Sequence, residues 1–193
     1  MIRGRGETPV GLSSVTKIWT GKGDDGTTGL LYGGRDLKSS PRFEALGHLD
    51  EAQAAIGMAR AETPAQGELN GFLVAVERDL WVLMAEMATD TANHPKLTEG
   101  TSKVSAAMVT AIEVIIDNVS ERFVLPTEFV VPGQDRTSAL LDLARAVVRR
   151  AERASVGIVE DGSQIIPYLN RLSSLLWTFA RWVEGVPLLA RET

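Results

Sequence analysis

The chain has 193 residues, of which 44% are hydrophobic and 23% charged, and its net charge at pH 7 is −5. This length and composition predict one soluble globular domain with a substantial core, and the acidic balance argues against a nucleic-acid or membrane-surface binder. Cysteine is absent, which excludes disulfides, thiolate metal sites and a cysteine nucleophile, and which fits a cytoplasmic location. No apolar run reaches the roughly 20 residues that a transmembrane helix needs.

The N-terminal part of the chain lacks helical periodicity. Residues 1–14 contain basic residues but no apolar stretch, so we interpret them as a flexible leader rather than a secretory signal. Residues 15–193 are expected to form a single domain. Its first part, 15–40, is rich in Gly, Asp, Thr and Ser and predicts a long loop with one short strand at 16–19. Loops of this length within compact domains are usually functional or disordered.

Segments with apolar residues at helical spacing follow this loop. They predict helices over residues 41–63, 66–89, 102–122, 136–160 and 164–184. Pro41 suits the first turn of the first helix. A polar connection, 90–100, and a segment bounded by prolines, 125–133, are expected to be non-helical, the second of them extended. The expected architecture is therefore all-α: a five-helix bundle preceded by a glycine-rich loop.

The predicted helix 136–160 contains the sequence RRAER at residues 149–153. At about 100° per residue, one face of this helix gathers charged side chains, namely Arg145, Arg149, Glu152 and Arg153. The opposite face is expected to be the core seam, made of Leu140, Leu143, Ala144, Val147, Val148 and Ala151. Guanidinium groups match phosphate oxygens bidentately, so the charged face indicates an anion site. A solvated charged face is the alternative.

The loop residues 20–29 read TGKGDDGTTG. Glycines let backbone N–H groups approach an anion closely, and Lys22 adds a mobile positive charge. The order of residues is not that of a Walker A motif. Lys38 follows a second glycine pair and could make a further phosphate contact. A cluster of surface turns is the alternative interpretation.

The predicted helix 164–184 has a polar stripe that includes one tryptophan, made of Asn170, Ser173, Ser174, Trp177 and Arg181. A solvated surface would be expected to carry Lys and Glu, so this stripe indicates a buried groove or a subunit interface. Asp50, on the first helix, is either solvated or a partner for an arginine of helix 136–160. Phe129 lies beside a turn, where a hydrophobic plug is more typical than a ligand contact.

Together, these segments resemble the PduO-type ATP:cob(I)alamin adenosyltransferase family. The stretches that carry the resemblance are KIWTGKGDDGTTGLLYGGRDLKSSPRFEALGHLDEAQAAIG, FVVPGQDRTSALLDLARAVVRRAER and YLNRLSSLLWTFARWV. RRAER is the most specific motif among them, and the resemblance extends from Lys17 to Glu184. It implies a five-helix, ferritin-like bundle that assembles as a homotrimer with active sites between subunits.

The resemblance also implies an enzyme that transfers the 5′-deoxyadenosyl group of ATP to cob(I)alamin and releases triphosphate. ATP, Mg²⁺ and the corrinoid are the expected small molecules. A reductase and an adenosylcobalamin-dependent enzyme are the expected protein partners. Because cob(I)alamin is itself a strong nucleophile, the protein has only to position the substrates and stabilise charge.

The resemblance assigns roles residue by residue. The ATP-binding loop would comprise Thr20, Gly21, Lys22, Gly23, Thr28, Gly29 and Lys38. The nucleotide motif would comprise Arg149, Arg150, Glu152 and Arg153, with Asn170 near the nucleotide. Three residues would have catalytic roles. Asp50 would pair with an arginine across the interface, with Arg149 as the expected partner, and Phe129 would pack under the corrin ring and exclude its lower ligand.

The sequence departs from the family pattern at several places. Lys22 is displaced by one position, Ser174 stands where the family has aspartate, and Ala52 and Gln53 replace the last two residues of a D-E-L-N pattern. Two other functions stay open at this level. One is a non-catalytic sensor or delivery chaperone that binds ATP or adenosylcobalamin, and the other is a structural bundle whose arginine face binds a partner.

Overall fold

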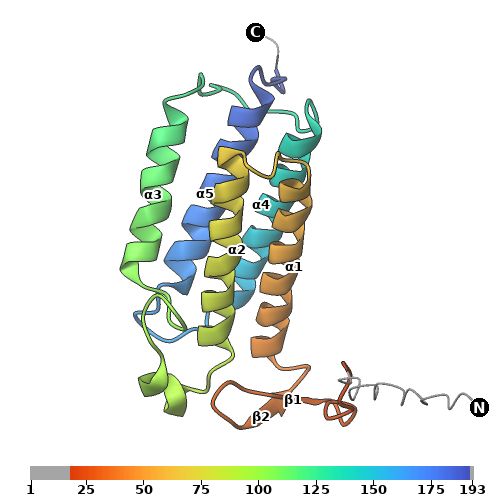
Figure 1. Ribbon diagram of the computed structural model, residues 1–193, viewed down its shortest axis with the longest axis vertical. Coiled ribbons are helices and arrows are strands. Elements are labelled where there is room, and N and C mark those ends of the chain that lie inside the picture. Colours follow the sequence, from red (N-terminus) through yellow and green to blue (C-terminus); the bar gives the residue numbers. More distant parts are fainter. Residues whose placement is uncertain (1–17, 192–193) are drawn as a thin grey trace, which may run out of the picture.

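The computed structural model describes residues 18–191. Five α-helices run along the long axis of the molecule and are joined by loops at its two ends (Figure 1). Their bounds are α1 Pro41–Ala61, α2 Glu68–Met87, α3 Ala106–Ser120, α4 Arg136–Ser155 and α5 Ile165–Glu184. A short 3₁₀ helix, η1, spans Thr91–Lys96 between α2 and α3. The predicted all-α five-helix bundle is confirmed, and none of the described helices is long and apolar enough to span a membrane.

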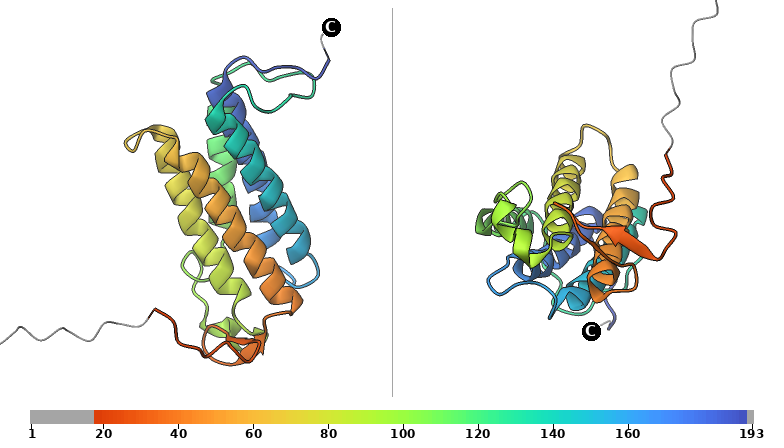
Figure 2. Two further views of the ribbon diagram at one scale, coloured as in Figure 1. Left: turned by 90° about the vertical axis from the view of Figure 1, so that its right-hand side faces the viewer. Right: turned by 90° about the horizontal axis from the view of Figure 1, so that it is seen from below.

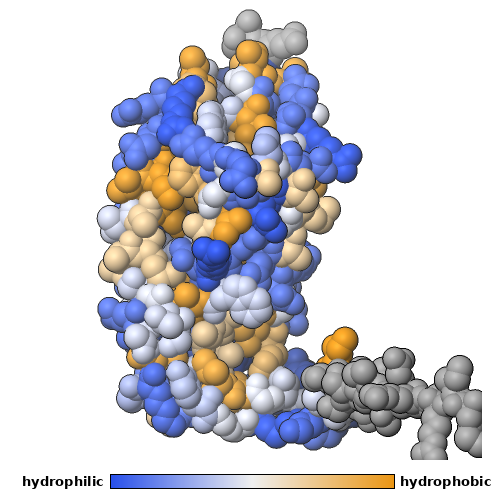
Figure 3. Space-filling view, viewed as in Figure 1, coloured by the Kyte–Doolittle hydropathy of each residue, from blue (hydrophilic) through white to orange (hydrophobic). Residues whose placement is uncertain are grey.

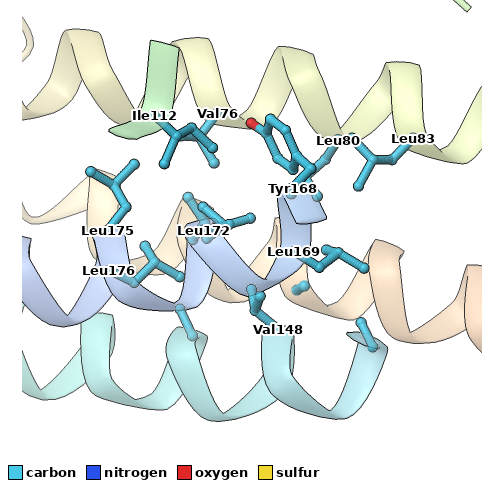
Figure 4. Close-up of a cluster of buried hydrophobic side chains, with 14 of the residues drawn as sticks. Val76, Leu80, Leu83, Ile112, Val148, Tyr168, Leu169, Leu172, Leu175 and Leu176 are labelled. Atoms are coloured by element: carbon cyan, nitrogen blue, oxygen red, sulfur yellow. The ribbon is translucent and has the colours of Figure 1, made fainter. Parts of the chain in front are cut away.

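Helix α5 lies inside the bundle. It packs against α3 and α4, while α1 packs against α4 and α2; the end-on view in Figure 2 shows this arrangement. Leucines of α5 point toward Val76 and Leu80 of α2, Ile112 of α3 and Val148 of α4 (Figure 4). Tyr168 is fully buried among them, and its hydroxyl donates to Asp79 Oδ2 at 2.8 Å. This hydrogen bond satisfies the polar group that the aromatic ring carries into the core.

Three helix starts follow from local chemistry. Ser40, Ser105 and Asp135 occupy the N-cap positions of α1, α3 and α4, and each side chain accepts from a backbone N–H of the first turn. Helix α3 therefore begins at Ala106, four residues later than the predicted 102. Short polar side chains compete with the helix for backbone donors, which is why they mark its start.

Two expectations for α4, the helix that contains RRAER, are wrong. Helix α4 ends at Ser155 rather than at residue 160, because Val156 is extended and Gly157 has φ +83°. Leu143, placed in the core seam by the sequence, is 50% exposed. The seam is rotated: Leu141 and the polar residues Ser138 and Asp142 are buried instead.

The segment predicted as a long loop contains a small antiparallel hairpin. Strand β1 (Thr27–Gly29) pairs with β2 (Arg35–Leu37), with Thr28 opposite Asp36. The strand expected at 16–19 is not found, because Ile18 and Trp19 are not in a strand and residues 16 and 17 lie outside the described residues. The predicted leader, 1–14, also lies outside them.

The loops gather at opposite ends of the bundle. The hairpin lies at the lower end in Figure 1, together with η1 and the connection between α4 and α5. The segment between α3 and α4, which contains Phe129, lies at the upper end with the C-terminal residues. RRAER, near the end of α4, therefore lies toward the end that carries the glycine-rich loop.

Candidate functional site

The glycine-rich loop, residues 20–38, is held in shape by Arg35. Its guanidinium donates from Nη2 to the Lys22 carbonyl at 2.5 Å and from Nε to Thr27 Oγ1 at 2.8 Å. Asp25 Oδ1 accepts from the backbone N–H of Thr27 at 2.9 Å and from its hydroxyl at 2.8 Å. These hydrogen bonds, followed by the charge of Arg35, lower the pKa of the Asp25 carboxyl. These contacts connect the start of the loop with both strands of the hairpin.

Two predicted loop residues meet inside this hairpin. A Cβ atom at Gly23 would lie 2.9 Å from Lys38 Nζ and 3.2 Å from the Thr27 carbonyl oxygen. Only a glycine at position 23 leaves room for the lysine at this distance, so the position of the Lys38 ammonium group depends on Gly23. Gly21 adopts φ +67°, which a glycine tolerates. The structure therefore places the ammonium group of Lys38 directly against the backbone of the loop at Gly23.

The hairpin is attached to the end of α2. The Leu31 N–H donates to the Ala88 carbonyl at 2.9 Å, and the Tyr32 ring lies 5.8 Å from Lys96 Nζ. Tyr32 has φ +64°, an uncommon conformation for a residue with a side chain. This attachment fixes the loop relative to the helices.

Of the four charged residues of RRAER, two make polar contacts with other helices and two make no ion pair within the described residues. Arg150 forms an ion pair with Glu51 of α1, which lowers the pKa of that carboxyl. Glu152 accepts a hydrogen bond from Asn170 Nδ2 at 3.1 Å. Arg149 and Arg153 are exposed and make no ion pair within the part of the chain that the structure describes. Two permanent positive charges are therefore available to a ligand.

The polar stripe of α5 forms the floor of a groove between α3 and α4. The groove measures about 390 Å³. We call it the arginine groove; it is lined by Ile116, Ser120, Arg145, Arg149, Ser173, Ser174, Trp177 and Thr178. Three residues of the predicted stripe, Ser173, Ser174 and Trp177, face this groove, whereas Asn170 is exposed outside it and Arg181 is buried. The alternative prediction of a subunit interface stays a prediction. Two guanidinium groups and several hydroxyls make the groove suited to an anionic or amide-rich ligand.

Phe129 is 86% exposed in the single chain, so the interpretation as a buried plug is wrong. Its carbonyl accepts from the Ala190 N–H at 2.7 Å, and the Val131 N–H donates to the Leu188 carbonyl at 2.8 Å. Near the upper end of the bundle, hydrophobic residues are exposed among hydrophilic ones on the surface seen in Figure 3. The C-terminal segment thus holds the Phe129 loop while leaving the ring free.

A second hollow, of about 230 Å³, connects this ring to the arginine groove. Phe129 lines one side of it, and Arg145 and Trp177 line both the hollow and the groove. A flat apolar ligand against Phe129 would therefore come close to the arginines of α4.

Two residues that line this hollow, Asp142 and Arg181, form a buried ion pair that the sequence did not predict. Arg181 Nη2 and Asp142 Oδ2 are 2.6 Å apart, and the two side chains are 2% and 6% exposed. The other oxygen of Asp142 accepts from Arg145 Nε at 3.3 Å, and the Arg181 guanidinium lies 5.8 Å from the centre of the Trp177 ring. The sequence feature that could have indicated this pair is Asp142, a single carboxylate among the leucines of α4.

Other predicted site residues are not brought together in one chain. Asp50 is exposed and makes no ion pair within residues 18–191, and neither Lys22 nor Lys38 makes one with α4. The pairing of Asp50 with Arg149 was expected across subunits, so it stays a prediction. Thr20 accepts a weak hydrogen bond from the Lys22 N–H at 3.4 Å, and Thr28 and Gly29 lie in β1.

Comparison with known proteins places this geometry in a family. The cobalamin adenosyltransferase family model matches residues 18–183. The chain is 36% identical to corrinoid adenosyltransferases of Mycobacterium tuberculosis and Citrobacter freundii, over 86% and 89% of its length and 88% and 97% of theirs.

Among solved structures, a phenylalanine-to-histidine variant of the PduO-type ATP:corrinoid adenosyltransferase from Lactobacillus reuteri, complexed with cobalamin and ATP, is similar over 91% of this chain and 97% of that one. The TM-score is 0.80 at 25% identity. The predicted family, its helical bundle and its class of enzyme are confirmed. The chain belongs to the cobalamin adenosyltransferase family.

Proposed function

We propose that this chain transfers the 5′-deoxyadenosyl group of ATP to cob(I)alamin, giving adenosylcobalamin and triphosphate. The observation that carries the proposal is the state of RRAER: Arg150 and Glu152 are engaged within the fold, whereas Arg149 and Arg153 remain unpaired. The names of its relatives and the ligands of the similar Lactobacillus reuteri structure support the same reaction.

In the proposed reaction, the cobalt of cob(I)alamin donates its electron pair to the ribose C5′ atom. The C5′–O5′ bond breaks, and its electron pair leaves with triphosphate. The residues of this chain hold the departing group: Arg149, Arg153 and Lys38 offset its negative charge, and the glycine-rich loop supplies backbone donors. No protein nucleophile or proton donor is needed, which agrees with the residue types at the site.

Mg²⁺ would enter as part of the ATP substrate. Residues 18–191 contain no group of three or more His, Asp or Glu side chains placed to hold a metal ion. The His, Asp and Glu residues in this range are therefore not grouped as a resident metal centre would require. Mg²⁺ commonly binds through substrate phosphates, one or two carboxylates and several waters, so the triphosphate would supply most of its ligands here.

The corrinoid would lie against Phe129. This ring is exposed at the edge of the hollow that Trp177 and Arg145 share with the arginine groove. An apolar ring under cobalt would displace the lower axial ligand and ease the reduction of Co(II) to Co(I). Arg149, in the same groove, would lie close to the nucleotide.

A homotrimer with intersubunit sites completes the proposal. Within one chain the glycine-rich loop makes no ion pair from Lys22 or Lys38 to α4, so a neighbouring subunit would provide the second half of the nucleotide site. Asp50 of one subunit would pair with Arg149 of the next. Sedimentation analysis tests the trimer. A reductase, an adenosylcobalamin-dependent enzyme and the cytoplasmic location stay predictions.

The direct test is an assay with ATP, Mg²⁺ and chemically reduced cobalamin, followed in the visible spectrum. We expect a light-sensitive alkylcobalamin and one triphosphate per turnover. If ATP and cobalamin bind but no alkylcobalamin forms, the protein is a sensor or delivery chaperone. If neither binds, the arginine face is a surface for protein contacts.

A further inference from the structure

A chain of hydrogen bonds crosses from α3 through α5 to α4. Arg171 donates from Nε to Glu113 Oε1 at 2.8 Å and from Nη1 to Asn170 Oδ1 at 2.7 Å. Asn170 Nδ2 then donates to Glu152 Oε1 at 3.1 Å. Helix α3, which contributes none of the predicted site residues, is thereby connected to RRAER.

This chain determines how the Asn170 amide is turned. A guanidinium only donates, so the amide oxygen must face Arg171, and a carboxylate only accepts, so the amide nitrogen must face Glu152. Both ends of the amide are therefore specified by charged partners. Glu113 holds Arg171 in turn: the side chains of both are partly exposed, at 43% and 42%, and would otherwise sample several rotamers.

The direction of the amide matters because Glu152 has a competing partner. Arg149 lies three residues earlier on α4, a spacing at which opposite charges on a helix attract each other. In the structure Glu152 is bonded to Asn170, and Arg149 makes no ion pair within residues 18–191. An intrahelical pair would neutralise the guanidinium that the proposed function needs.

We propose that Glu113 and Arg171 are positioning residues that hold the Asn170 amide against Glu152 and so keep Arg149 free for the phosphate oxygens of the nucleotide. The inference rests on the proposed function. It adds two residues from outside the RRAER segment and the glycine-rich loop, and it gives Asn170 a task besides any contact with the nucleotide.

The test is Arg171→Lys, which keeps the charge. One ammonium group cannot reach both acceptors that the guanidinium fork bridges from two nitrogens. Arg122→Lys is the control, because Arg122, in the turn after α3, also bonds a glutamate of a neighbouring helix, Glu68 of α2, at 2.7 Å and makes no hydrogen bond to Asn170. Both substitutions are made in the full chain and in an Asn170→Ala background, and KM for ATP and kcat are measured.

We expect Arg171→Lys to raise KM for ATP about threefold, as suits a partly exposed charged contact, with a smaller change in kcat. The change should vanish in the Asn170→Ala background, and Arg122→Lys should have no effect in either. The side-chain amide resonance of Asn170 should shift in Arg171→Lys without nucleotide. An equal rise in KM in both backgrounds, or an unchanged KM, would overturn the proposal.

The amide resonance and the dissociation constant for ATP separate this inference from the proposed reaction. If ATP binds but no adenosylcobalamin forms, the reaction is overturned, and the same comparison of variants is made with the dissociation constant. If that constant is the same in Arg171→Lys and the unaltered chain, the positioning role is overturned even when turnover is observed.

Discussion

Arg181 and Asp142 form an ion pair that is almost fully buried, with Nη2 and Oδ2 2.6 Å apart. It joins α5 to α4, and both residues line the hollow that Phe129 also lines. Because Asp142 also accepts from Arg145 and Arg181 lies beside the Trp177 ring, this pair supports two walls of the proposed corrinoid site. Its energetics can be tested separately from catalysis.

Asp142→Ala should destabilise the fold by up to about 3–5 kcal/mol, because it removes one of the two carboxylates, Asp142 and Glu184, that pair with the buried Arg181 guanidinium. The triple variant Asp142→Leu, Arg181→Met, Glu184→Leu removes all three buried charges and should recover most of that loss. Urea unfolding of the unaltered protein, Asp142→Ala and the triple variant measures the difference. A triple variant less stable than Asp142→Ala would show that the three charges do not depend on one another.

Arg149→Ala should raise KM for ATP at least tenfold (~1.4 kcal/mol) and lower turnover, while the melting temperature changes little. The physical reason is that Arg149 makes no ion pair within the described chain, so its charge is not used for folding. Arg136→Ala, on the exposed start of the same helix, is the control. Unchanged kinetics in Arg149→Ala would remove the proposed phosphate contact.

Gly23→Ala should weaken ATP binding without unfolding the hairpin. The added methyl group would lie 2.9 Å from Lys38 Nζ, so the flexible end of the lysine would move away. Calorimetric titration with ATP measures the loss. Gly47→Ala is a matched control on α1, where a Cβ meets nothing within 4 Å; it should leave ATP binding intact and stabilise the protein by about 0.5–1 kcal/mol.

Phe129→Ala should reduce turnover and the reduction of bound cobalamin by tenfold or more, with ATP affinity and stability unchanged. The exposed ring contributes little to the single-chain fold, so its loss acts on the corrinoid alone. Val124→Ala, at another exposed apolar position of the same loop, is the control. An equal loss of ATP and corrinoid binding would contradict this separation of roles.

Much of the fold was predictable because it depends on local patterns. Periodic apolar residues predicted each of the five helices, and the polar stripe of α5 indicated a groove or a subunit interface, of which a groove is found along part of the stripe. RRAER and TGKGDDGTTG were recognisable because the residues of each motif lie close together in one segment of the sequence. Two errors were at helix boundaries, Ser155 and Ala106, which are set by a glycine and by a cap. The others were the exposed Leu143, the exposed Phe129 and the hairpin β1–β2, all of which depend on contacts outside a single helix.

The primary structure alone therefore determined which segments are helical and which motifs bear charge, and it located most of the apolar positions, with Leu143 of α4 as an exception. Only the folded arrangement decided how those charges pair. Arg35 orders the hairpin across its two strands, Asp142 meets Arg181 across two helices, and Glu152 bonds Asn170 while Arg149 makes no ion pair within the described residues. Periodicity reports how a side chain lies on its own helix, but ion pairing depends on the packing of neighbouring helices, which no single segment encodes.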